Sequence, residues 1–177
     1  GKTHTVKTLA KNIFGSEDAM IRVDMSEYAE KHNVARMIGS PPGYVGYGEG
    51  GQLTEKVRRK PYCIVLFDEL EKAHPSVMDI MLQIFDDGHL TDGEGRKVDF
   101  RNTIIVMTSN IGASAVNQMV TPVGFGADKP AVKEENTKEL IKREWSKRLK
   151  PEFINRIDEI VIFSSLSKDN IYKIIDI

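Results

Sequence analysis

The sequence predicts an α/β fold in which a parallel sheet is flanked by helices. Short apolar runs rich in β-forming residues alternate with helical segments, and three of these runs are apolar nearly throughout, as strands covered on both faces must be. The expected strands are residues 19–25, 62–69, 102–110 and 158–163. A chain of 177 residues with 40% hydrophobic content can bury one core, so we expect one globular unit.

Three helices are expected from apolar residues at helical spacing. The first opens at residues 1–3 and has one apolar face, formed by Val6, Leu9, Ala10, Ile13 and Phe14. The second lies between the second and third strands, begins near Pro75 and ends at Gly88. The third covers about residues 133–149 and ends before Pro151. A strand, a helix and a strand in this order form the crossover unit of a parallel sheet.

Two further segments are recognisable from their turn residues. Residues 88–100, "GHLTDGEGRKVDF", predict a β-hairpin that turns at residues 92–95 and is inserted before the third strand. Residues 39–51, "GSPPGYVGYGEGG", are too rich in glycine and proline to form a helix or a strand. The polar stretch 120–136 is the one long loop, and such loops are usually functional or disordered.

Charge and cysteine content exclude several classes of partner. The net charge is −1 with both signs interspersed, so we expect no nucleic-acid partner and no anionic membrane surface. No apolar run approaches the roughly 18 residues of a membrane span. The single cysteine, Cys63, lies in the apolar run "YCIVLF" and is expected to be a buried structural thiol. No disulfide can form within the chain, which suits a reducing compartment.

The first three residues predict the end of a phosphate-binding loop. Gly1 lets the backbone wrap phosphates, Lys2 reaches the outer phosphates, and the Thr3 hydroxyl coordinates Mg²⁺. The earlier glycines of the G-x-x-x-x-G-K-[ST] pattern and the strand that should precede them are expected upstream of Gly1. We therefore expect the chain to be a fragment whose first strand is not included.

Two acids and an amide follow the expected strands. Asp68 and Glu69 end the second strand, at the edge where open α/β sheets bind ligands. Asp68 would hold Mg²⁺ through water, and Glu69 would polarise the attacking water as general base. The alternative is that Asp68 and Glu69 only cap the strand and have no catalytic role. The presence of Gly-Lys-Thr upstream disfavours this alternative. Asn110 would orient the water and sense the outer phosphate, or else be a turn residue.

Residues 26–112, together with "LKPEFINRIDEIVIFSSLSKDNI", resemble the second ATPase module of the Clp/Hsp100 unfoldases, a branch of the AAA+ superfamily. The resemblance covers essentially the whole chain. It implies a P-loop NTPase large subdomain at residues 1–163 and the start of a small helical lid at residues 164–177. It also implies ATP and Mg²⁺ as cofactors and a homo-hexamer of the full-length protein.

The resemblance gives the glycine-rich loop a role. In that family "GYVG", here Gly43, Tyr44, Val45 and Gly46, is the pore loop whose aromatic ring grips an unfolded polypeptide. A flat amphipathic ring suits contact without sequence preference. The alternative is that Tyr44 packs against its own domain, which is also the preferred interpretation of Tyr47.

The resemblance also identifies Arg156 as the arginine finger, donated to ATP in the neighbouring subunit. A guanidinium fits developing phosphate charge, whereas the sequence alone suggests an ion pair with Asp158 or Glu159. Lys150 stands where the family commonly has arginine. Because the chain ends before the sensing arginine of the lid, we expect weak or absent ATPase activity in isolation.

The polar loop distinguishes two subfamilies. Protease-coupled members that resemble ClpC carry a hydrophobic tripeptide there, which docks on the ClpP peptidase, and Val123, Gly124 and Phe125 resemble it. We expect an ATP-driven unfoldase and translocase that uses adaptors, in the bacterial cytoplasm or an organelle stroma. The main alternative is a disaggregase like ClpB or Hsp104 that works with a DnaK-type chaperone. A nucleotide-dependent scaffold that binds ATP without hydrolysing it fits less well, because Asp68, Glu69, Asn110 and Arg156 are all present. A DNA-loading module also fits less well, because the glycine-rich loop contains no lysine or arginine.

Overall fold

The computed structural model describes residues 1–163 apart from 45, 49 and 112–133. Its central sheet contains three parallel strands, β1 (Met20–Asp24), β2 (Cys63–Asp68) and β5 (Thr103–Met107), in the order β1-β2-β5. The register pairs Asp24 with Asp68 and Phe67 with Met107, so the carboxyl ends of all three strands meet at one edge. Three of the four predicted strands are confirmed.

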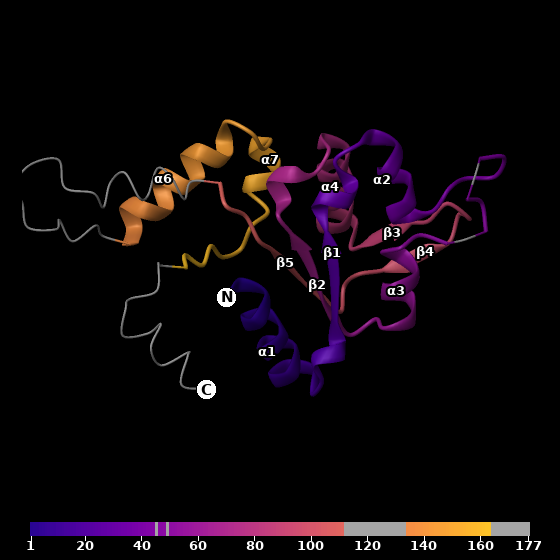
Figure 1. Cartoon of the computed structure of the whole chain (residues 1–177), viewed down its shortest axis with the longest axis horizontal. Helices are drawn as coiled ribbons and strands as arrows, with labels where there is room; N and C mark the ends of the chain where they lie inside the picture. Colours follow the sequence, from indigo (N-terminus) through magenta and orange to yellow (C-terminus); the bar gives the residue numbers. More distant parts are fainter. Residues whose placement is uncertain (45, 49, 112–133, 164–177) are drawn as a thin grey trace, which may run out of the picture.

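Strand β2 is buried on both faces because helices cover the sheet on each side (Figure 1). On one face, Ile64 and Leu66 form a small core with Val6 and Ala10 of α1 (Lys2–Phe14). On the other face, alternate residues of β2 enter the larger core: Cys63, Val65 and Phe67. This alternation follows from the two-residue period of a strand.

Helices α2 (Lys31–Ile38), α3 (Thr54–Arg59), α4 (Pro75–Asp87) and α7 (Pro151–Ile154) contribute to the larger core. The remaining elements are α6 (Glu134–Ser146) and three short 3₁₀ helices: η1 (Glu17–Ala19), η2 (Met25–Tyr28) and η3 (Leu70–Lys72). The predicted helices correspond to α1, α4 and α6. Helix α4 begins at a proline and is terminated by its C-cap Gly88, whose φ of 66° is left-handed, as expected.

The predicted hairpin is confirmed. Strands β3 (His89–Thr91) and β4 (Lys97–Asp99) pair antiparallel. Their inward-facing residues Leu90 and Val98 are buried in the larger core. The hairpin extends beside α3 in Figure 1, next to the glycine-rich loop.

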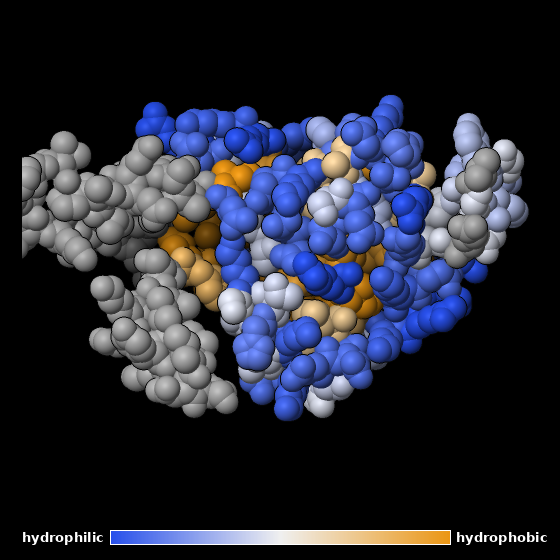
Figure 2. Space-filling view, in the orientation of Figure 1, coloured by the Kyte–Doolittle hydropathy of each residue, from blue (hydrophilic) through white to orange (hydrophobic). Residues whose placement is uncertain are grey.

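The prediction of a strand at residues 158–163 is wrong, because this segment forms no helix or strand. A strand needs a neighbouring strand to accept its backbone hydrogen bonds, and none of the described strands pairs with it. Val161 and Phe163 are instead 72% and 48% exposed, and hydrophobic surface is visible near β5 in Figure 2. Within α1, Leu9 and Ile13 are also partly exposed, so the apolar face is buried only in part.

Among the described helices, none is long and apolar enough to cross a membrane.

Candidate nucleotide site

The start of α1 meets the end of β5 at the carboxyl edge of the sheet. The Nζ atom of Lys2 donates to the backbone oxygen of Ser109 at 2.8 Å and to Oδ1 of Asn110 at 2.6 Å. Gly1 is the N-cap of α1, and Thr3 lies half-buried in its first turn. Lys2 and Asn110, both identified from the sequence, are therefore brought together.

Asp68 is buried, and its carboxylate accepts hydrogen bonds from two side chains, Arg22 and Thr108. Arg22 donates from Nε at 2.8 Å and forms an ion pair from a terminal nitrogen at 2.7 Å, and the hydroxyl of Thr108 donates to the other carboxylate oxygen. Only 9% of the Asp68 side chain is exposed, so these donors replace water around the charge. The Thr108 hydroxyl and the Asp68 carboxylate therefore place oxygen atoms close together, and oxygen is the ligand that hard cations such as Mg²⁺ prefer.

Arg22 was not identified as a site residue from the sequence. It faces two carboxylates, Asp68 and Asp24, which are register partners on adjacent strands. A single guanidinium between them offsets their mutual repulsion. The available signal was a charged residue in the middle of an otherwise apolar strand. That signal alone does not specify the partner, because the pairing of β1 with β2 brings the two aspartates together.

Thr108 was also not identified from the sequence, although it lies two residues before Asn110. Its hydroxyl accepts a hydrogen bond from the backbone N–H of Glu69 at 3.1 Å, and its own N–H donates to the oxygen of Phe67. The oxygen of Thr108 in turn accepts from the N–H of Leu70 at 3.0 Å. Thr108 therefore ties the turn after β2 to the end of β5.

Glu69 has an unusual backbone conformation. Its φ of 60° and ψ of 52° make it the single non-glycine residue of the described part with positive φ. Such a conformation costs of order 1–3 kcal/mol and persists only where its surroundings hold it. Here Thr108 holds the N–H, and Lys72 donates to the side chain at 2.6 Å. The pKa of Lys72 is raised, chiefly by the hydrogen bond to Glu69.

The glycine-rich loop lies away from these residues, at the far side of the molecule in Figure 1. Gly43 and Gly46 have φ values of 89° and 88°, which glycine adopts readily. Tyr44 is 71% exposed and Tyr47 is 54% exposed. Neither ring is packed into the core of its own domain, which was the alternative interpretation for Tyr44 and the preferred one for Tyr47. Val45 lies outside the described residues.

Arg156 follows α7 and is half-exposed. Its guanidinium lies 2.5 Å from Oδ1 of Asp86 in α4, which is not a partner that the sequence suggested. Lys150 also binds α4, because its Nζ donates to Asp79 at 2.8 Å and this contact raises the pKa of Lys150. Val123, Gly124 and Phe125 lie outside the described residues.

The described residues contain no group of three or more His, Cys, Asp or Glu side chains that could hold a metal ion. Thr3 and Asp68 could together supply two oxygen ligands. Mg²⁺ in nucleotide sites is commonly held by one or two protein ligands with phosphates and waters completing the shell, so the residues present fit that ion.

Comparisons with known proteins give a consistent result. The family model for the AAA domain (Cdc48 subfamily) matches residues 1–160. The chain is 55% identical over 177 residues to the negative regulator of genetic competence ClpC/MecB of Bacillus subtilis, covering all of this chain and 22% of that protein. It is 54% identical over 175 residues to the ATP-dependent Clp protease ATP-binding subunit ClpC of Staphylococcus saprophyticus, covering 99% and 21% respectively. The chain therefore spans about a fifth of the length of these relatives.

Two solved structures are also similar. One is a closed state of Hsp104 with ATPγS and FITC casein, with a TM-score of 0.81, and the other is the extended Saccharomyces cerevisiae Hsp104:casein complex, with a TM-score of 0.82. Each is 46% identical to this chain and covers 99% of it, while the chain covers 29% of each.

Proposed function

Because the chain belongs to the AAA domain family (Cdc48 subfamily) and is a ClpC-like module of the Clp/Hsp100 branch, we propose that its full-length protein unfolds polypeptides with ATP and threads them into a ClpP-type peptidase. The family is one of nucleotide-binding ATPases. The observation that carries the proposal is the contact of Lys2 with Asn110 at the edge where β2 ends in Asp68 and is followed by Glu69. A cation, an amide and two carboxylates at one edge of the sheet support a role in phosphate binding and water activation.

Each side chain has a role in this proposal. Lys2 moves from the amide oxygen of Asn110 to the outer phosphates, and the released amide orients the attacking water. Glu69 accepts the proton of that water, after its carboxylate leaves the ammonium of Lys72. Thr3 and Asp68 would hold Mg²⁺, which neutralises charge on the phosphates when bound.

Arg156 would act on a neighbouring subunit of a homo-hexamer. Its position supports this role, because the half-exposed guanidinium is held at the surface by Asp86. A planar guanidinium can donate two parallel hydrogen bonds to a phosphate, and arginine fingers contribute roughly 10³ to 10⁵ in rate in related enzymes. Replacing Arg156 with lysine keeps the charge but loses this geometry, so we expect hydrolysis to fall.

Tyr44 would grip the substrate. Its exposure on a loop with two left-handed glycines supports this, because the ring is available and the backbone can change conformation. The substrates are unfolded proteins, delivered with or without adaptors. We place this activity in the bacterial cytoplasm or an organelle stroma.

The test uses the full-length protein, a ClpP-type peptidase and a tagged fluorescent substrate. Tyr44→Ala should slow ATP-dependent substrate loss more than tenfold and leave basal ATP hydrolysis within about twofold, since the ring contacts polypeptide and not nucleotide. Tyr47→Ala, on the same loop, is the matched control and should retain activity. Glu69→Gln should bind ATP and abolish hydrolysis. Normal substrate loss with Tyr44→Ala would refute the gripping role.

The peptidase partner needs a separate test, because the Hsp104 structures are also compatible with a disaggregase, although the ClpC relatives favour the peptidase-coupled function. Deletion of residues 123–125 should abolish degradation while unfolding and ATP hydrolysis persist. If degradation is unchanged by the deletion, these residues are not the dock. If the full-length protein never engages the peptidase but cooperates with a DnaK-type chaperone, the disaggregase function replaces the one proposed here.

A further inference from the structure

The β3–β4 hairpin has no role in the function proposed above, yet its turn lies against the base of the glycine-rich loop. The backbone N–H of Gly93 donates to the oxygen of Ile38 at 2.9 Å. A Cβ atom on Gly93 would lie 2.6 Å from the carbonyl carbon and oxygen of Gly39. No real Cβ makes contacts that short, so only glycine allows the hairpin to approach this closely.

The two ends of the loop are themselves joined at this point. The N–H of Gln52 donates to the oxygen of Arg36 at 2.8 Å, and the N–H of Leu53 donates to the oxygen of Met37 at 3.0 Å. A Cβ atom on Gly51 would lie 2.4 Å from the carbonyl carbon of Ile38. Three backbone segments therefore pack closely together, with the buried Thr54 hydroxyl against Gly51 and Ile38, and they hold the base of the loop.

Arg96 stabilises the hairpin turn through Asp92. The Asp92 side chain is 2% exposed and accepts hydrogen bonds from Nε of Arg96 at 2.7 Å and from the N–H groups of Glu94 and Arg96. Burial by itself raises the pKa of Asp92, but these hydrogen bonds outweigh it and lower the pKa. Asp92 is therefore ionised at neutral pH and keeps the turn in one conformation.

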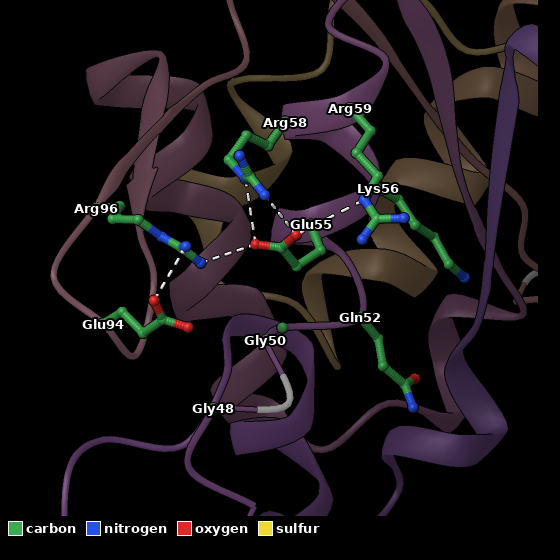
Figure 3. A pocket seen from close by; sticks show the side chains of 10 residues that line it. Gly48, Gly50, Gln52, Glu55, Lys56, Arg58, Arg59, Glu94 and Arg96 are labelled. Carbon is green, nitrogen blue, oxygen red and sulfur yellow. Dashed lines mark hydrogen bonds and ion pairs between the residues drawn. The ribbon is translucent and has the colours of Figure 1, made fainter.

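The same arginine reaches the loop through Glu55 of α3. In Figure 3, Arg96 and Arg58 converge on the Glu55 carboxylate, with Gly50 close to it. The terminal nitrogen of Arg96 donates to Oε1 of Glu55 at 2.8 Å, and Arg58 donates to Oε2 at 2.8 Å. A Cβ atom on Gly50 would lie 2.6 Å from the γ-carbon of Glu55. The Glu55 side chain thus covers the end of the loop.

We propose that Arg96 is a positioning residue for the loop that carries Tyr44. It holds the hairpin turn through Asp92 and the end of the loop through Glu55, so the base of the loop is fixed while Tyr44 remains exposed. When the base of the loop is fixed, a movement of the domain also moves the Tyr44 ring. When the base is loose, the loop changes conformation and the ring follows the domain less. The proposal rests on the gripping role proposed for Tyr44.

The experiment compares Arg96→Met and Arg96→Lys with the unchanged full-length protein. We expect Arg96→Met to increase hydrogen exchange in peptides that cover residues 39–53 and to slow substrate unfolding about five- to tenfold. Basal ATP hydrolysis should change less than about twofold, because Arg96 does not contact the nucleotide site. Arg96→Lys keeps one charged donor and should restore part of the unfolding rate.

Arg101→Met is the matched control, since Arg101 follows the same hairpin and forms an exposed pair with Asp99 at 2.7 Å that does not reach the loop. It should change neither measurement. If the Arg96→Met variant unfolds substrate at the wild-type rate, the proposal is overturned, whether or not hydrogen exchange increases. Tyr44→Ala separates the two hypotheses: if that variant unfolds substrate normally, the gripping role fails, while exchange in residues 39–53 still reports whether Arg96 orders the loop.

Discussion

The Nζ atom of Lys2 lies 2.6 Å from Oδ1 of Asn110, although 108 positions separate the two residues. Helix α1 begins at Lys2, and Asn110 follows β5, so the contact depends on how α1 packs on the sheet. The side chains of Val6 and Ala10 determine that packing, because they are buried in one cluster with Ile64 and Leu66 of β2. A few apolar contacts therefore place the ammonium beside the amide.

The first prediction follows from this contact. Asn110→Ala in the full-length protein should lower kcat for ATP hydrolysis about 10²-fold and change nucleotide affinity less than about fivefold, because the amide is expected to orient water and not to bind phosphate. Steady-state hydrolysis and binding of a fluorescent nucleotide measure the two effects. Asn102→Ala, an exposed position just before the same strand, is the control. Equal losses in kcat and affinity would contradict the role in water orientation.

A second prediction concerns pH. The hydroxyl of Ser26 donates to Asp24 at 2.6 Å, and this hydrogen bond is the main cause of the lowered pKa of Asp24. A lowered folded-state pKa contributes stability above the unfolded value of 3.8, and this contribution is lost as pH falls through the folded-state pKa. Ser26→Ala should therefore cost about 0.5–1 kcal/mol at pH 7. Urea unfolding at pH 7 and below pH 4 should show the difference shrinking; a constant difference would contradict this assignment.

The third prediction concerns Cys63, which is fully buried at the start of β2. Burial raises the pKa of its thiol to about 11, so little thiolate exists at pH 8 and reagents cannot reach it. Iodoacetamide should modify the folded chain at least about 10²-fold more slowly than the chain in urea. Cys63→Ser gives the background of the assay. Similar rates for the folded and unfolded chains would show that the thiol is accessible.

The fourth prediction uses two glycines of the hairpin turn. Gly93→Ala places a methyl group 2.6 Å from backbone atoms of Gly39 and should destabilise the loop base by about 1–3 kcal/mol. Gly95 has a φ of 80° with no atom within 4 Å of a built Cβ, so Gly95→Asn, which tolerates that conformation, should cost less. Hydrogen exchange of residues 36–40 and 51–53 measures both. Equal effects would mean that close approach is not what requires Gly93.

The strands β1, β2 and β5, the helices α1, α4 and α6 and the β3–β4 hairpin were all predictable, because each is encoded by local periodicity and turn residues. Residues 158–163 carry the same kind of local signal, yet they form no strand. The difference is that a strand is stable only when another backbone pairs with it, and local sequence does not reveal whether that partner is present.

The sequence by itself determined which side chains are available for chemistry: Lys2, Asp68, Glu69 and Asn110 follow from residue type and position at strand and helix ends. Only the tertiary structure decided their partners, such as Arg22 for Asp68 and Asp86 for Arg156. The same holds for the packing of Gly93 against Gly39. A strand or a helix end depends on interactions between near neighbours in the chain, whereas these contacts exist only after β2 has brought distant segments to its two edges and two faces.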